Sequence, residues 1–103
     1  MPEYPPRPLT PRESALDVRI WRWPSHSMPL LLVNASRKQG HAVLRNRFRR
    51  RVRMAFLDLL RRRPVQEGLV VWVRPAKGSR LGCNIPYAEI ADQLELALRR
   101  WKP

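Results

Sequence analysis

Six arginines within nine residues are the feature of this chain whose type and spacing point to chemistry. The nine residues from 45 to 53 contain Arg45, Arg47, Arg49, Arg50, Arg51 and Arg53. A guanidinium group keeps its charge at physiological pH and binds phosphate oxygens through two parallel N–H donors. Phe48 and Val52, four residues apart, give the run one apolar side if it is helical. The run therefore predicts a rigid array of phosphate-binding groups.

The charge of the whole chain favours the same kind of partner. The 103 residues contain 21 Lys and Arg against 8 Asp and Glu, a formal net charge of +13 at pH 7. Residues 36–63 hold eleven of the basic side chains and one acid, Asp58. Nucleic acid is the commonest polyanion for such a domain, although an anionic membrane surface or an acidic protein would also attract it. The excess of Arg over Lys suits phosphate binding, but a GC-rich genome would produce the same excess.

No group of residues in the sequence forms a catalytic or metal site. His26 and His41 are the only histidines, and neither has a Cys, His or Asp at metal-ligand spacing. The acids are scattered, so no pair is placed for general acid-base catalysis. The single cysteine, Cys83, excludes an internal disulfide framework and is expected to be a small buried hydrophobe, as in a cytoplasmic protein. The longest apolar stretch, residues 28–33, is too short to cross a bilayer, so no membrane partner is expected.

A long helix must position the arginines. Its signature is an apolar residue every three or four positions, at Leu44, Phe48, Val52, Ala55, Phe56 and Leu59. The helix should run from about His41 to Arg62, because Pro64 stops it. The side opposite the apolar stripe would carry Asn46, Arg47, Arg50 and Arg53. Arg45 and Arg49 would lie along one border of the stripe.

Three strands are expected beside this helix. The alternation of residues 18–23 predicts the first strand. The leucine run in residues 29–33 predicts a second strand that is buried on both faces. Residues 69–73 are almost all β-branched or aromatic and predict a central strand. The second and third strands would form a strand-helix-strand crossover, which a general rule makes right-handed when the strands are parallel.

Two further helices complete an α/β fold. Thr10, Pro11 and Glu13 are typical of a helix start, although this helix can only be short. A C-terminal helix should begin near Pro86 and run toward Trp101. The expected architecture is a small sheet of three to four strands, a long central arginine-rich helix in the crossover and the C-terminal helix. Residues 10–103 would form this single domain, and residues 1–9, with four prolines, a flexible tail.

Three tryptophans on the expected strands have two possible uses. Trp21, Trp23 and Trp72 could stack on unpaired bases, each stack contributing about 1–3 kcal/mol to binding. A tryptophan in a strand is more often part of the core. Alternation places Trp21 and Trp23 on the same side of the sheet, so one use must hold for both.

Residues 36–53 resemble the signature of the bacterial ribonuclease P protein component. The resemblance covers a loop, a helix start and an arginine core, and it needs no insertion or deletion. The matching residues are Ser36-Arg37-Lys38, Gly40-His41-Ala42-Val43, Arg45-Asn46-Arg47, then Arg49, Arg50 and Arg53. Arg74-Pro75 and the helix start at Pro86-Tyr87 are similar to the family's last strand and helix. His41 stands where the family usually has Lys. The chain before Leu30 is also about one strand shorter than the family pattern.

The resemblance implies a subunit of a ribonucleoprotein that removes the 5′ leader from precursor tRNA. In that family the RNA subunit is the catalyst and holds Mg²⁺, while the protein has no catalytic residue, metal or organic cofactor of its own. The implied partners are the ribonuclease P RNA and precursor tRNA, with no protein partner required. The implied fold is the type shared with the second domain of a small-subunit ribosomal protein, and its crossover is left-handed.

Carried over by position, the RNA-binding residues are those of the loop and the helix: Ser36, Arg37, Lys38, Arg45, Asn46, Arg47, Arg49, Arg50 and Arg53. The family holds the single-stranded leader in a cleft between sheet and helix, where Trp21, Trp23 and Trp72 would be the stacking candidates. Two other classes of protein share part of the pattern. A ribosomal or other structural RNA-binding protein would have the same charge without a link to tRNA processing. A DNA-binding helical module would need a short helix before the arginine helix, and the expected strands argue against it.

Overall fold

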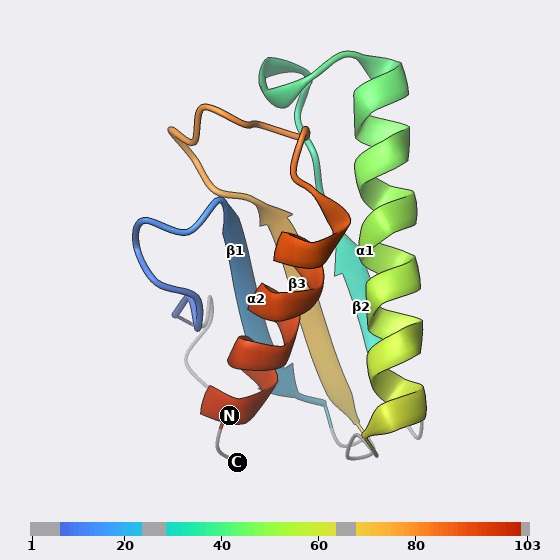
Figure 1. The fold of residues 1–103 in the computed structure, drawn as a ribbon. Coiled ribbons are helices and arrows are strands. Elements are labelled where there is room, and N and C mark those ends of the chain that lie inside the picture. The colour runs from blue at the N-terminus through green and yellow to red at the C-terminus, as the bar shows by residue number, and fades with distance from the viewer. Residues whose placement is uncertain (1–6, 24–28, 64–67, 102–103) are drawn as a thin grey trace.

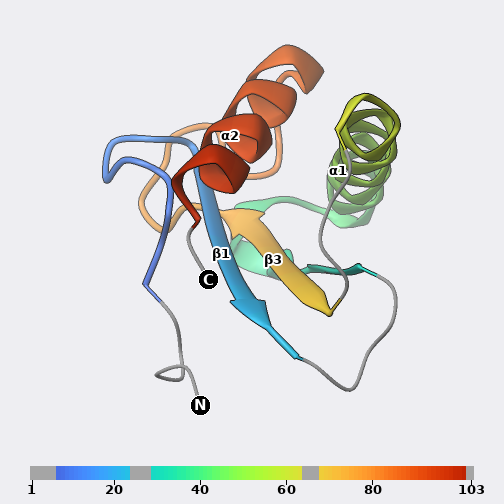
Figure 2. The ribbon, with the colours of Figure 1, turned by 90° about the horizontal axis from the view of Figure 1, so that it is seen from below.

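Two helices cover one face of a three-stranded sheet in the computed structural model of the chain, which describes residues 7–23, 29–63 and 68–101 (Figure 1). The elements follow in the order β1 Leu16–Arg22, β2 Leu30–Val33, the 3₁₀ helix η1 Arg37–Gln39, α1 Ala42–Arg62, β3 Leu69–Pro75 and α2 Tyr87–Arg100. In the view from below, α1 and α2 lie on the same side of the sheet, so the other face carries neither of them (Figure 2). The expected α/β class is confirmed.

β3 is the central strand, as its apolar run predicts. It pairs antiparallel with β1, from Leu16 opposite Pro75 to Arg22 opposite Leu69, and parallel with β2. β2 lies at the edge of the sheet, where Leu32 is 40% exposed. The expected burial of β2 on both faces is wrong, because both helices lie on the same face of the sheet.

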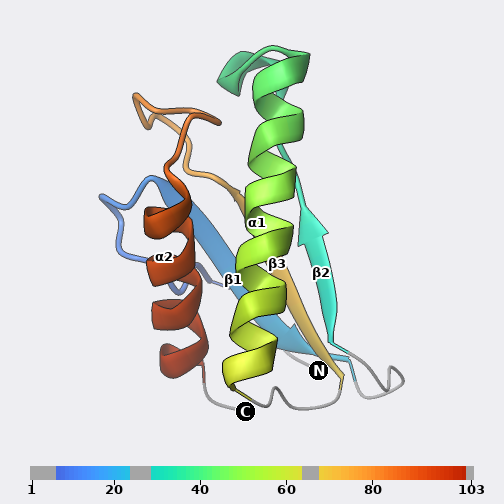
Figure 3. The ribbon, with the colours of Figure 1, turned by 45° about the vertical axis from the view of Figure 1, so that its right-hand side comes forward.

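The crossover from β2 through α1 to β3 is left-handed. In Figure 1 the helices face the viewer, β2 and β3 both run upward, and β3 lies to the left of β2. Figure 3 shows α1 in front of these two strands after the molecule is turned. The general rule for such crossovers therefore does not hold here, whereas the handedness implied by the resemblance does.

One apolar stripe of α1 packs against the rest of the domain. Its buried residues are Phe48, Val52, Ala55, Phe56 and Leu59, as the spacing predicts. They join one hydrophobic core with Val18 and Val71 of the sheet and with Ile90 and Leu94 of α2. Burying a large apolar side chain contributes about 1.5–3 kcal/mol to the free energy of unfolding. The stripe therefore holds the arginines of the helix in a fixed array.

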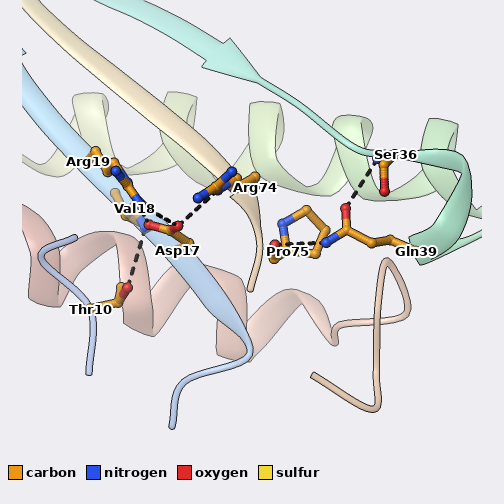
Figure 4. Close-up of polar contacts among 8 residues, drawn as sticks. All are labelled: Thr10, Asp17, Val18, Arg19, Ser36, Gln39, Arg74 and Pro75. Atoms are coloured by element: carbon orange, nitrogen blue, oxygen red, sulfur yellow. Dashed lines mark hydrogen bonds and ion pairs between the residues drawn. The ribbon is translucent and has the colours of Figure 1, made fainter. Parts of the chain in front are cut away.

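The segment before β1 is a turn rather than the expected short helix. The N–H of Ser14 donates to the Pro11 carbonyl at 3.0 Å, and the Thr10 hydroxyl accepts from the N–H of Val18 at 3.3 Å (Figure 4). Thr10 therefore binds the edge of β1 instead of capping a helix. β1 begins at Leu16, two residues before the alternation indicates, which leaves too little chain for a helix.

Part of the expected tail also follows the edge of β1. The N–H of Leu9 donates to the carbonyl of Val18 at 2.8 Å. Residues 1–6, and most of the turns expected around 25–27 and 66–68, lie outside the described residues.

Two glycines with positive φ shape the loop after β3. Gly82 has a φ of 53°, and a Cβ atom there would collide with the carbonyl oxygen of Gln39. This close approach lets the N–H of Cys83 donate to the same carbonyl at 2.8 Å. Gly78 has a φ of 81°, and a Cβ atom there would have no neighbour within 4 Å.

We expect Gly82→Ala to lower the free energy of unfolding by about 3 kcal/mol, because it adds a collision with Gln39 to the strain of a positive φ. Gly78→Ala is the matched control, since it carries only the strain, about 1 kcal/mol. Urea unfolding of both variants, followed by circular dichroism, measures the difference. Equal losses would contradict the contact between the two loops.

Candidate nucleic-acid interface

The outward face of α1 presents a row of polar and basic groups. Asn46, Arg47, Arg50 and Arg53 are exposed there, as the helical spacing predicts. The single acid of α1, Asp58, pairs with Arg62 at 3.3 Å near the end of the helix. The first turn has no acid, so the partial positive charge of the helix end adds to that of the arginines. This face is therefore suited to a polyanion.

A second basic surface is a hollow of about 850 Å³ formed by the loops that follow β2 and β3. The loop at 34–39 makes one wall, the loop at 76–82 makes the other, and α1 contributes one arginine. The cations of this hollow are Lys38, Arg49, Arg74, Lys77 and Arg80, and no acid is among its lining residues. A concave surface with several cations and no acid favours phosphate groups. We call it the cationic hollow.

Gln39 joins the two walls of the cationic hollow (Figure 4). Its Nε2 donates to the Pro75 carbonyl at 3.0 Å, and its Oε1 accepts from the N–H of Ser36 at 3.1 Å. Its backbone carbonyl accepts from the N–H of Cys83. The first wall is therefore tied to the end of β3 and to the loop that follows it.

The residues expected to bind RNA divide between these two surfaces. The structure places three of them in the cationic hollow: Ser36, Lys38 and Arg49. Four lie on the outward face of α1: Asn46, Arg47, Arg50 and Arg53. Arg37 is exposed on η1, outside the lining of the hollow. The arginines of residues 45–53 therefore contribute to two surfaces of different shape rather than to one.

Two arginines of the run turn away from the outward face. Arg51 donates to the Ile85 carbonyl at 2.8 Å and ties α1 to the segment before α2. Arg45 is half-buried, and its Nε is shielded without a hydrogen-bond partner among the described residues.

Burial raises the pKa of the Cys83 thiol, and the nearby charges of Arg45 and Arg49 oppose that rise. Cys83 is buried, as the sequence analysis predicts.

Trp72 lies on the sheet face that carries no helix. The guanidinium carbons of Arg19 and Arg74 lie 5.7 and 5.3 Å from its ring centre. Asp17 pairs with both arginines, at 3.2 Å for Arg19 and 2.9 Å for Arg74 (Figure 4). Trp21 packs edge-on against Trp72, with 6.5 Å between the ring centres. This face therefore combines aromatic surface with two oriented cations.

Trp21 and Trp23 do not share one environment, contrary to the expectation from alternation. Trp21 pairs with Val70 inside the sheet and is 9% exposed, whereas Trp23 is 51% exposed. β1 ends at Arg22, so Trp23 lies beyond the last strand pair, where alternation no longer applies. One use therefore does not hold for both side chains.

Several residues of these surfaces could not be identified from the sequence. Lys77 and Arg80 give only the weak signal of basic residues in a glycine-containing loop. Their place opposite Lys38 depends on β3 lying directly beside β2, which the expected crossover allows but does not require. Gln39 gives only the signal of a capping box with Ser36, because its second bond depends on the position of Pro75.

The described residues contain cations and aromatic rings at these surfaces rather than metal ligands. Within that part of the chain, no group of three or more His, Cys, Asp or Glu side chains could hold a metal ion. None of the helices described is long and apolar enough to cross a membrane.

Comparison with known proteins places this geometry in a family. The family model described as Ribonuclease P matches residues 12–102. The RNase P protein of Staphylococcus aureus is 23% identical with a TM-score of 0.58, covering 82% of this chain and 72% of that chain. The RNase P protein from Thermotoga maritima is 23% identical with a TM-score of 0.62, covering 84% and 79%. These two structures share the fold. A comparison with curated proteins found no match.

Lys77→Ala or Arg80→Ala should weaken the binding of a single-stranded RNA oligonucleotide. Each lost phosphate contact should make the slope of log K against log salt shallower by about 0.7. Fluorescence anisotropy at several salt concentrations measures both effects. Arg99→Ala is the control, because Arg99 is exposed on α2 and pairs with Glu95 at 2.9 Å. An equal loss in that control would mean attraction by net charge alone.

Proposed function

We propose that the two basic surfaces of this chain, which belongs to the bacterial ribonuclease P protein family, hold two different RNAs. The matched region, residues 12–102, is nearly the whole chain. Membership makes the chain the protein subunit of ribonuclease P, an endoribonuclease ribonucleoprotein that acts on precursor tRNA. Its partners are therefore the ribonuclease P RNA and precursor tRNA.

The outward face of α1 is the surface that binds the RNA subunit. Arg47, Arg50 and Arg53 stand on one side of a helix whose other side is buried, so their spacing is fixed before RNA arrives. Pre-arranged guanidinium groups lose little conformational entropy when they bind phosphates. Arg37 and Asn46 extend this surface toward the loop before the helix. Arg45, between that loop and the core, contributes from a half-buried position.

The cationic hollow and the adjoining sheet face bind the single-stranded 5′ leader. The observation that carries this assignment is the position of Arg74, which lines the hollow and also lies over Trp72. Proteins bind single strands by combining a positive groove for the backbone with aromatic side chains for the bases. Ser36, Lys38 and Arg49 would contact phosphates. Trp72 and the exposed Trp23 would contact bases, while Trp21 would support Trp72 from its edge.

The chemistry of the enzyme belongs to its RNA. Mg²⁺ is held by the RNA subunit at the cleavage site. Residues 10–103 of the protein act as one RNA-binding domain in the cytoplasm. The cations of the protein reduce the repulsion between the two RNAs, so that less Mg²⁺ is needed to bring them together. The protein needs no catalytic residue for this role.

The alternative of a DNA-binding helical module has no support in the fold. η1, with three residues, and β2 precede α1, so the described chain has no helix-turn-helix there. The alternative of a ribosomal or other structural RNA-binding protein is set aside by the family match.

Adding this protein to a bacterial ribonuclease P RNA should lower the Mg²⁺ concentration required to cleave precursor tRNA, because bound cations replace counterions. Cleavage across a Mg²⁺ titration, with and without the protein, is the measurement. A disordered basic peptide of equal charge is the control. If several such RNAs show no stimulation beyond that of the peptide, the proposed role in tRNA processing is contradicted.

Arg47→Ala or Arg50→Ala should weaken assembly with the RNA subunit and make its salt slope shallower by up to about 0.9 for each variant. Arg7→Ala should do neither, because Arg7 is exposed in the segment before β1 and does not belong to α1. Filter binding at several salt concentrations compares the three variants. Three equal effects would indicate unspecific attraction by charge.

A further inference from the structure

We propose that Gln39 is a positioning residue that sets the width of the cationic hollow and thereby its affinity for the leader. This inference rests on the leader-binding role proposed above. It concerns a neutral side chain whose capping-box bond to Ser36 can be read from the sequence, whereas its bond to the opposite wall cannot.

The side chain of Gln39 uses both ends of its amide. Nε2 donates to the carbonyl of Pro75, the last residue of β3, and Oε1 accepts from the N–H of Ser36. The first wall of the hollow is therefore bonded to the point where the second wall begins. A side chain with only donors or only acceptors could not make both bonds.

The walls need such a bond because they carry like charges. Lys38 lies on one wall, Lys77 and Arg80 lie on the other, and no acid lines the space between them. Like charges that face one another across a hollow repel, so the free protein would favour a wider opening. An acidic bridge would oppose this repulsion but would also weaken phosphate binding. The neutral amide of Gln39 holds the walls without removing positive charge.

The backbone of Gln39 is held independently of its side chain. Its N–H donates to the Ser36 carbonyl at 3.0 Å, and its carbonyl accepts from the N–H of Cys83 at 2.8 Å. Gly82 packs closely against the same carbonyl. These backbone contacts join the first wall to the last residue of the second wall and to Cys83, whereas the side chain joins it to Pro75, where the second wall begins. Replacing the side chain should therefore release only the bond at Pro75 and the capping-box bond to Ser36, and leave the contact with Gly82 and Cys83 in place. A variant at this position tests the width of the hollow rather than the fold.

The test compares Gln39→Met with Gln93→Met in an enzyme reconstituted with a bacterial ribonuclease P RNA. Methionine matches the length of glutamine but makes neither hydrogen bond. Gln93 lies on α2, and its Oε1 has no hydrogen-bond partner in the described structure, which makes it a matched control. Gln39→Glu is a second variant, because it keeps the acceptor for Ser36 and loses only the donor to Pro75.

The quantity measured is the preference of the enzyme for precursor tRNA over mature tRNA, given by the ratio of their dissociation constants. We expect Gln39→Met to reduce this preference about fivefold, the loss expected for two weakened hydrogen bonds. Gln39→Glu should reduce it at least as much, because its carboxylate adds a negative charge to the hollow. The cleavage rate at saturating substrate, the affinity for the RNA subunit and Tm should stay near the values for the Gln93→Met enzyme.

The outcomes separate this inference from the function it rests on. If the wild-type enzyme prefers precursor tRNA and both Gln39 variants keep the full preference, the positioning role is overturned and the leader-binding role stands. If the variants lose preference only together with Tm and RNA assembly, Gln39 is merely structural and the inference is also overturned. If the protein gives the wild-type enzyme no preference for the leader, the proposed role of the hollow fails, and this inference fails with it.

Discussion

The burial of one stripe of α1 is the interaction on which the rest of the structure depends. Six arginines in nine residues repel one another, and no acid in the first turn offsets the positive end of the helix dipole. The opposing force is the burial of Phe48, Val52, Phe56 and Leu59, each contributing about 1.5–3 kcal/mol. Because that stripe faces the sheet and α2, the arginines must lie on the remaining sides. The force that folds the domain therefore also determines where its charge is presented.

The elements with local signals could be predicted from the sequence. The apolar spacing of α1 and the β-branched run of β3 report their own burial, so both were found near their observed bounds. The helix start expected at Thr10 is wrong because a hydroxyl can cap a helix or bind a strand, and the distant contact with Val18 decides between them. The burial expected for β2 is wrong because a leucine run shows that a strand is apolar but not how many of its faces are covered. The left-handed crossover came from the resemblance and contradicts the general physical rule.

Only part of the candidate site could be predicted from the sequence. The outward face of α1 follows from helical geometry alone, so the sequence is enough to place its exposed residues. The cationic hollow could not be predicted although the crossover was expected, because its walls are loops distant in the sequence whose approach depends on contacts such as that of Gln39 with Pro75. Trp23 shows the same limit, since its exposure depends on β1 ending one residue earlier.

On the proposed assignment, α1 also fixes the geometry between the two RNAs. Arg49 lines the cationic hollow and Arg50 lies on the outward face, so adjacent residues of one rigid helix point toward different partners. Successive residues of an α-helix are separated by a rotation of about 100°, which leaves little freedom between the two directions. A protein subunit that holds the catalytic RNA and its substrate in a fixed relative position lowers the entropic cost of their encounter without supplying a reactive group. The arginines can therefore assist RNA catalysis although none of them takes part in the chemical step.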